Sequence, residues 1–369
     1  MARRILGRVP GIGKRWPYRA LNFLPSRQLW KYLAWKSRGR ADGLGVEAPF
    51  HLGNALNDCR RILVILPDSF QEILLALPVL QSLVHDLPET EWQFLGNQSD
   101  LPFLAAIFEP DQLLGIFSED LFWGETHFQN LEKTLKGFQP NLTVNLRRST
   151  PPLLAYLVRA SGANLRIQIG NSQNPSNQVP EPFANLYLQP VEPFNHLRRF
   201  ILPTTLWNFS NRPITCIWSR LKPGPDHLRE AHSRLTAKGL RPESTRVFLW
   251  QNMLSSFQQE VFQAAVNERH GPGESKSLVI LTATGAPFFN SPPDLQATSG
   301  IPSIEVESTA LLLGFLAQTA RSIGLNGPVL HLASLTDTDV DAHFEPGDAP
   351  WDTSFLNPRL NVVYRKPTL

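Results

Sequence analysis

A repeating order of short apolar segments and longer helical segments is the feature that most restricts how this chain folds. The run RILVIL at residues 61–66 is aliphatic and partly β-branched, as in a parallel strand buried on both faces. A helical pattern follows at residues 72–85, and the same order then recurs along most of the chain. Strands that alternate with helices predict right-handed βαβ units and parallel sheets.

The alternation falls into two blocks. The first block has further expected strands at residues 91–95, 113–117, 141–146 and 165–169, and helices at residues 101–108, 128–138 and 153–160. The second block has expected strands at residues 246–250, 277–282, 303–306, 321–325, 340–344 and 361–364, and helices at residues 226–238, 255–267, 309–320 and 329–335. We therefore expect a basic arm at 1–58, a Rossmann-like domain at 59–170, an irregular linker or insertion at 171–225 and a second Rossmann-like domain at 226–369.

Length and composition agree with two globular domains. The chain has 369 residues, 42% of them hydrophobic, which is enough for two cores. No apolar run reaches the roughly 18–20 residues of a membrane span, so an integral membrane protein is not expected. The two cysteines, Cys59 and Cys216, are far apart, which excludes a disulfide scaffold and a cysteine-based zinc site and suits a reducing compartment. We expect no metal and no cofactor.

Charge is concentrated at the N-terminus. Residues 1–40 contain eleven Lys or Arg and no Asp or Glu, and the whole chain carries +3, so the remaining residues carry −8. Aromatic residues lie between these cations, a combination typical of contact with an anionic membrane surface. The residues expected in that contact are Arg3, Arg4, Arg8, Lys14, Arg15, Trp16, Arg19, Trp30, Lys31, Trp35 and Lys36.

Two other interpretations of the arm stay open. It can pack onto the acidic body with its aromatic side chains buried, or it can bind nucleic acid, which the acidic body disfavours. No apolar stretch resembles a secretory signal, so we expect a cytoplasmic protein at the inner face of the cytoplasmic membrane.

Four motifs give the chain a family resemblance. They are ILVILPDSFQEILLALPVLQSL at 62–83, FQPNLTVNLRRS at 138–149, LNGPVLHLASL at 325–335 and HFEPGDAPW at 343–351. In order and spacing they resemble glycosyltransferase family 9, the lipopolysaccharide heptosyltransferases. The resemblance covers residues 61–365 and implies a GT-B architecture, in which two Rossmann-like domains face each other across a cleft. It also implies inverting transfer of a sugar from a nucleotide sugar, such as an ADP-heptose, to a lipopolysaccharide-like or other glycolipid acceptor, with no metal.

The first motif carries the catalytic residue that the resemblance implies. The family has a Ser-x-Gly-Asp loop whose Asp is the base, and this chain has Gln71 and Glu72 in place of the Gly and the Asp. A carboxylate here can still accept a proton from an acceptor hydroxyl. Glu72 can instead be an acidic first-turn residue that the helix dipole favours. The expected acceptor-side residues are Asp68, Ser69, Gln71, Arg147 and Arg148.

The donor side departs further from the family. The family's second carboxylate is lost: Asn326 replaces it if the alignment is counted back from His331, and Leu325 replaces it if Gly327-Pro328 is aligned. No Lys or Arg follows Arg246 in the run 246–257. The helix that begins at Gly327 still offers N–H groups to a diphosphate. His331 can contact a phosphate or can be a core histidine. The expected donor-binding residues are Gly285, Asn326, Gly327, Pro328, His331, Gly347 and Asp348.

Two functions are consistent with these motifs. One is a glycosyltransferase of family 9 type, which Glu72 and the helix start at Gly327 support. The other is a catalytically inactive GT-B descendant that binds a protein or a membrane. The altered ligand loops and the basic arm support this second function. Fold alone does not decide between them.

Overall fold

The computed structural model describes only part of the chain. The described residues are 51–105, 107–116, 126–147, 150–169, 184–188, 200, 203–212, 214, 221, 223–250, 256–269, 277–283, 300–325, 327–344 and 360–364, with backbone alone for 71, 256, 269, 283 and 360–364. Residues 1–50 of the basic arm expected at 1–58 therefore lie outside the described residues, as do Arg148, Gly285, Asn326, Gly347 and Asp348. The expected boundary at 58 is too late, because residues 52–57 form a helix whose Leu56 is buried in the core of the first domain.

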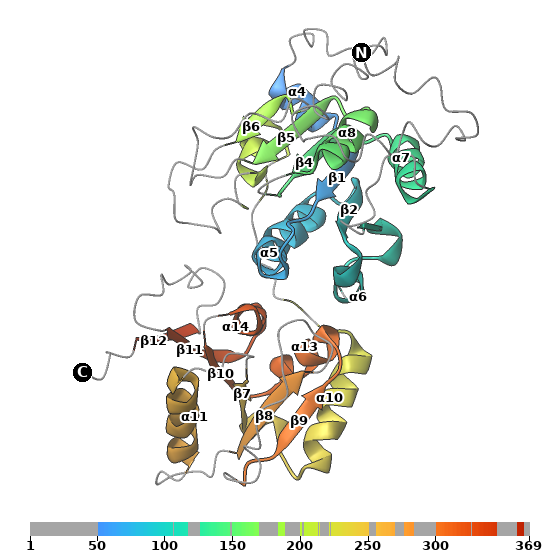
Figure 1. Cartoon of the computed structure of the whole chain (residues 1–369). Helices are drawn as coiled ribbons and strands as arrows, with labels where there is room; N and C mark the ends of the chain where they lie inside the picture. The colour runs from blue at the N-terminus through green and yellow to red at the C-terminus, as the bar shows by residue number, and fades with distance from the viewer. Residues whose placement is uncertain are drawn as a thin grey trace, which may run out of the picture.

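The first domain is a six-stranded parallel sheet with helices on its faces (Figure 1). The strand order is β3-β2-β1-β4-β5-β6. The strands are β1 (Arg61–Ile65), β2 (Glu91–Asn97), β3 (Leu113–Ile116), β4 (Leu142–Asn145), β5 (Leu165–Ile169) and β6 (Leu186–Leu188). The helices are α4 (Leu52–Asn57), α5 (Phe70–Asp86), α6 (Leu101–Leu104), α7 (Thr126–Phe138) and α8 (Pro152–Ala160), and the 3₁₀ helix η5 spans Leu206–Phe209.

The second domain repeats this plan. Its sheet is parallel and has the order β12-β11-β10-β7-β8-β9, which is the order of the first sheet traced from the opposite edge. The strands are β7 (Thr245–Leu249), β8 (Ser277–Ala283), β9 (Ser303–Val306), β10 (Arg321–Leu325), β11 (Asp339–Phe344) and β12 (Leu360–Tyr364). The helices are α10 (Pro225–Ala237), α11 (Ser256–Arg269), α13 (Thr309–Gln318) and α14 (Pro328–Ser334). Both orders are those of a Rossmann fold.

The apolar segments expected to be strands form the cores. Every residue of β4, β5 and β7 is buried, as expected for parallel strands covered on both faces. The predicted helix at 101–108 is shorter than expected, because α6 ends at Leu104. Phe108 turns back onto the sheet and stacks on Phe94 with ring centroids 4.2 Å apart. The N–H groups of Ile107 and Phe108 both donate to the Leu104 carbonyl at 2.9 Å, so the chain closes in a turn after α6.

The first sheet extends into the stretch expected to be a linker. Its sixth strand, β6, pairs with β5 at residues 186–188. Asn185 fixes the start of this strand, since its side-chain oxygen accepts from the Arg166 backbone N–H at 2.7 Å and its amide donates to the Asn164 carbonyl at 2.7 Å. Three residues are too few to show a strand periodicity, and the bonds of Asn185 are not visible in the sequence. The first domain thus continues past Gly170.

The two domains meet through helices. Helix α5 packs against α14, and α6 packs against α13, at the side of each domain that faces the other (Figure 1). The largest apolar cluster is continuous across this contact, with Leu77 and Leu80 of α5 and Leu330 and Leu332 of α14 among its members. Burial of such apolar surface stabilises the contact between domains by roughly 25 cal/mol per Å².

Candidate functional site at the carboxyl edge of the first sheet

The loop between β1 and α5 stands at the point where the strand order of the first sheet reverses. β1 lies between β2 and β4, and the chain leaves β1 and β4 toward different sides. In open parallel sheets, ligands bind beside the carboxyl ends of the strands at this point. Asp68 and Ser69 are exposed there. Ser69 is the N-cap of α5, and its hydroxyl oxygen accepts from the Glu72 backbone N–H at 3.2 Å.

A buried guanidinium holds this loop. Arg147, directly beyond β4, is 1% exposed and pairs through Nη1 with the Asp68 carboxylate, which is half exposed. Its Nε donates to the Leu66 carbonyl at 3.2 Å, and its Nη2 donates to Asn97 Oδ1 at 3.2 Å. One side chain therefore connects the ends of β1, β2 and β4. Burial lowers the pKa of Arg147, and the nearby carboxylates of Asp68 and Asp100 oppose that shift.

Polar side chains extend the network along the same edge. Asn97 donates to the Asp68 carbonyl at 2.9 Å and to Asp100 Oδ2 at 3.1 Å. Burial raises the pKa of Asp100, although the hydrogen bonds from Asn97 and Ser99 lower it in part. The edge is therefore a charged, hydrogen-bonded surface above an apolar core.

A second group of bonds fixes Arg147 itself. The Asn145 amide donates to Gln168 Oε1 at 2.6 Å and to Thr150 Oγ1 at 2.5 Å. Asn145 Oδ1 accepts from the Arg147 backbone N–H at 3.1 Å, and the Arg147 carbonyl accepts from Gln168 Nε2 at 3.1 Å. The sequence analysis missed Asn97, Asp100, Asn145 and Gln168. The available signal was a polar residue within or at the end of an apolar strand, as in LTVN and LRIQI.

Glu72 lies in the first turn of α5, beside the clamped loop. It is 6% exposed, so the folded chain covers most of its carboxylate. Ser69 and Glu72 occupy the N-cap and the third helical position, which is the spacing of a capping box. The position is compatible with both interpretations of Glu72, the base and the first-turn residue.

The corresponding place in the second sheet is formed by β10 and α14. Gly327 is the N-cap of α14, and Pro328 occupies the first turn. Backbone N–H groups there have no partner within the helix, so the missing N–H of Pro328 costs no hydrogen bond. His331 is 1% exposed between the buried Leu330 and Leu332, and burial lowers its pKa to about 4. This placement agrees with the core interpretation of His331 and keeps the imidazole neutral near pH 7.

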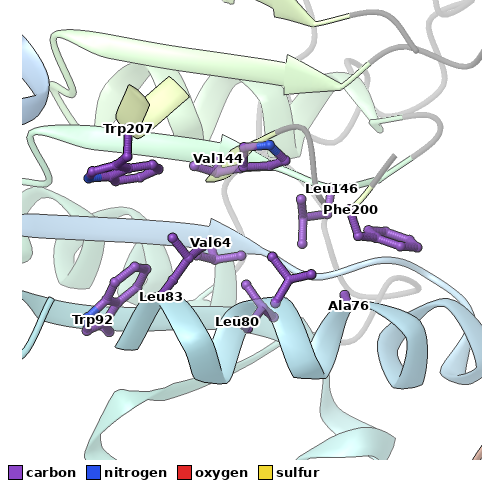
Figure 2. A pocket seen from close by; sticks show the side chains of 11 residues that line it. Val64, Ala76, Leu80, Leu83, Trp92, Val144, Leu146, Phe200 and Trp207 are labelled. Carbon is purple, nitrogen blue, oxygen red and sulfur yellow. The ribbon is translucent and has the colours of Figure 1, made fainter. Parts of the chain in front are cut away.

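An apolar cavity lies between the first sheet and α5 (Figure 2). Phe200 and Trp207, from the segment after β6, cover it opposite Leu80 and Leu83 of α5. The indole N–H of Trp207 is buried without a hydrogen-bond partner among the described residues. Apart from the two tryptophans, the lining is apolar, so the cavity lacks the convergent polar groups that orient a substrate.

The described residues show neither a metal-binding cluster nor a helix that could span a membrane. No group of three or more His, Cys, Asp and Glu side chains there is placed to hold a metal ion. No helix in the described ranges combines the length and the hydropathy that crossing a bilayer requires.

Two parallel sheets with the Rossmann strand order, joined through α5 and α14, define the GT-B class of fold. Solved structures bear this out. A family 9 glycosyltransferase from Veillonella parvula is similar with a TM-score of 0.59 and 12% identity, covering 84% of this chain and 88% of that one. The E. coli heptosyltransferase WaaC with ADP-2-deoxy-2-fluoro heptose is similar with a TM-score of 0.56 and 13% identity, covering 82% and 92%.

A third similar structure is the E. coli ADP-heptose lipopolysaccharide heptosyltransferase II, with a TM-score of 0.56, 12% identity and coverage of 82% and 90%. No family model matches the sequence, and no curated protein matches it either. The likeness extends over both domains and confirms, at the level of the fold, the resemblance to family 9 glycosyltransferases.

Proposed function

We propose that this protein is an inverting glycosyltransferase that moves a sugar from a nucleotide sugar to a hydroxyl of a glycan acceptor. The observation that carries the proposal is the carboxylate of Glu72 in the first turn of α5, beside the loop at the switch point of the first sheet. The GT-B fold supports it, as do the ADP and the ADP-heptose analogue bound in two similar structures. The acceptor then binds at the Asp68–Ser69 loop.

In the proposed reaction, Glu72 accepts the proton of the acceptor hydroxyl. The acceptor oxygen attacks the anomeric carbon, and the bond from that carbon to the diphosphate oxygen breaks. The nucleoside diphosphate leaves with the electron pair, and the anomeric centre is inverted because the acceptor oxygen attacks from the face opposite the leaving group. In the second domain, the backbone N–H groups that follow Gly327 are suited to the leaving diphosphate, whose charge they stabilise.

A second candidate is an inactive GT-B descendant, and the burial of the charged groups favours it. Arg147 is 1% exposed and already paired with Asp68, so its charge is committed within the chain. Glu72 is 6% exposed and stands in capping-box spacing with Ser69. In the sequence, the residues between Trp250 and Phe257 carry no charge, so a diphosphate meets no cation there.

Calorimetric titration with ADP-heptose and with UDP- and GDP-sugars separates the two candidates. Micromolar binding of one donor supports the transferase, and the search then turns to its acceptor. A folded protein that binds none of them at millimolar concentration supports the inactive descendant. With donor and acceptor known, Glu72→Gln should abolish transfer while donor affinity stays unchanged; near-normal turnover would remove Glu72 from the mechanism.

The basic arm is proposed to hold the protein at an anionic membrane surface. Eleven Lys or Arg in residues 1–40 suit this role, since each cation near such a surface contributes about 1 kcal/mol. Deletion of residues 1–40 should release the protein from vesicles that contain phosphatidylglycerol. Unchanged co-sedimentation would contradict the proposal, and tight binding to nucleic acid with a steep salt dependence would assign the arm a different partner.

A further inference from the structure

We propose that Arg147 is a positioning residue, which holds the loop between β1 and α5 in the conformation that places Glu72. The part of this inference that concerns transfer rests on the proposed function. The part that concerns the loop does not, since it can be measured on the free protein.

The guanidinium of Arg147 contacts three residues in two segments, the loop after β1 and the end of β2. It donates to the Leu66 carbonyl at 3.2 Å, pairs with the Asp68 carboxylate and donates to Asn97 Oδ1 at 3.2 Å. The planar guanidinium presents five donors in a fixed arrangement, so the three acceptors are constrained relative to one another. A lysine ammonium at the same position has three donors on a single atom and cannot span all three.

The loop is fixed on both sides of Asp68. The Asp68 carboxylate pairs with Arg147, and the Asp68 carbonyl accepts from Asn97 Nδ2 at 2.9 Å. The next residue, Ser69, accepts from the Glu72 backbone N–H at 3.2 Å, and its carbonyl accepts from the Ile73 N–H at 3.0 Å. The constraint therefore passes along the chain from Arg147 to Asp68, then through the cap to the first turn of α5.

Arg147 can act in this way because it is fixed in turn. Its backbone N–H donates to Asn145 Oδ1 and its carbonyl accepts from Gln168 Nε2, both at 3.1 Å. Asn145 and Gln168 are bonded to each other at 2.6 Å, so β4 and β5 hold the base of the side chain. The network is buried, where each hydrogen bond is stronger than in water.

The energetic cost of this arrangement favours a positioning role over a purely stabilising one. Taking a guanidinium out of water costs several kcal/mol, and well-packed apolar side chains in place of a whole buried ion pair often stabilise a core as well or better. The neighbouring Leu146 shows that this edge accommodates apolar residues, since it is buried at 2% exposure. What an apolar residue at 147 cannot supply is three directional bonds to the ends of β1 and β2.

Hydrogen–deuterium exchange of the full-length protein tests the inference. In Arg147→Lys and in Asp68→Asn, the amides of Ser69–Ile73 should exchange about tenfold faster, while those of β4 and α8 keep their protection. The matched control is Arg246→Gln, because Arg246 is also a buried strand arginine, bonded to Glu268 at 2.9 Å and to the Ala265 carbonyl at 3.2 Å, but in the other domain. It should leave Ser69–Ile73 unchanged.

Two exchange results would overturn the inference. One is unchanged protection of Ser69–Ile73 in both variants. The other is a uniform loss of protection across the first domain, which would assign Arg147 a general structural role. Asp68→Asn keeps the test usable if Arg147→Lys folds poorly, because the Asp68 side chain is half exposed.

Transfer kinetics supply the second readout if the wild-type protein proves active. A misplaced base should lower kcat by about 10²-fold in Arg147→Lys and leave the KM for donor within about twofold. An equal kcat in variant and wild type would overturn the catalytic part of the inference. If the wild-type protein transfers no sugar, the proposed function fails, and the exchange experiment still decides whether Arg147 holds the loop.

Discussion

The two switch points of the molecule differ in the charge that lies beside the carboxyl ends of their strands. In the first sheet, Arg147 and Asp68 lie just beyond the carboxyl ends of β4 and β1. In the second sheet, Arg246 is the second residue of β7 and Arg321 is the first residue of β10, both near the amino ends. A ligand beside the carboxyl ends therefore meets built-in charge at the first edge, whereas the described charges of β7 and β10 lie away from the second.

This contrast shows that two domains of one fold can distribute polar residues for different purposes. Arg321 pairs with Asp341 at 3.3 Å and with Asp339 at 3.6 Å, which connects neighbouring strands where no Rossmann ligand binds. The pair of Arg147 and Asp68 instead shapes a loop at the ligand edge. The predictions below test the contrast, from the largest expected effect to the smallest.

Loss of Arg147 should lower the free energy of unfolding more than loss of Arg246 in the second domain. Arg147→Met leaves the buried Asp100 without its nearby cation and breaks three contacts, so a loss of about 3–5 kcal/mol in the free energy of unfolding is expected. Arg246→Met should cost about 1–2 kcal/mol, because its partner Glu268 is largely exposed and can be hydrated. Urea unfolding of both variants measures the difference; equal losses would remove the contrast.

The core histidine of the second domain should make stability depend on pH. Burial lowers the pKa of His331 from 6.5 to about 4, so the unfolded chain binds a proton that the folded chain rejects. The contribution of His331 to stability is therefore fully present above pH 6.5 and is lost as the pH drops from 6.5 to 4, by about 3 kcal/mol in total.

Replacement of His331 isolates this effect. In His331→Leu, the decline between pH 6.5 and pH 4 should be smaller by about the same 3 kcal/mol in urea unfolding at several pH values. Equal declines in the variant and the wild type would show that His331 titrates normally and is accessible. That result would strengthen its candidacy as a donor contact.

Replacement of Asp100 should change the free energy of unfolding least, and it should raise it. Burial raises the pKa of Asp100, so its ionised form is unfavourable in the folded state at pH values above the unfolded pKa near 3.8. Asp100→Asn should be as stable as the wild type at pH 4 and more stable at pH 7, by less than about 1 kcal/mol. A variant that is less stable at pH 7 would indicate that Asp100 stabilises Arg147 by more than its burial costs.

Local patterns in the sequence predicted most of the architecture. The strand expected at 165–169 is observed at those residues, and the helix expected at 309–320 spans Thr309–Gln318. Such segments follow from periodicity and from caps such as Ser308, which are properties of neighbouring residues. The motif at 62–83 likewise predicted Ser69 and Glu72 as site residues, and these two roles stay predictions.

The site depended on contacts between residues far apart in the chain. Arg147 was expected at the acceptor side, but nothing in the sequence shows that it is buried or that it binds Leu66, Asp68 and Asn97. Those partners are 50 to 81 positions away and become neighbours only when β1, β2 and β4 align in one sheet. The sequence by itself determined the two αβ domains, because short-range periodicity sets the secondary structure. Tertiary structure alone decided that Arg147 is buried and paired with Asp68, because burial and pairing exist only in the assembled sheet.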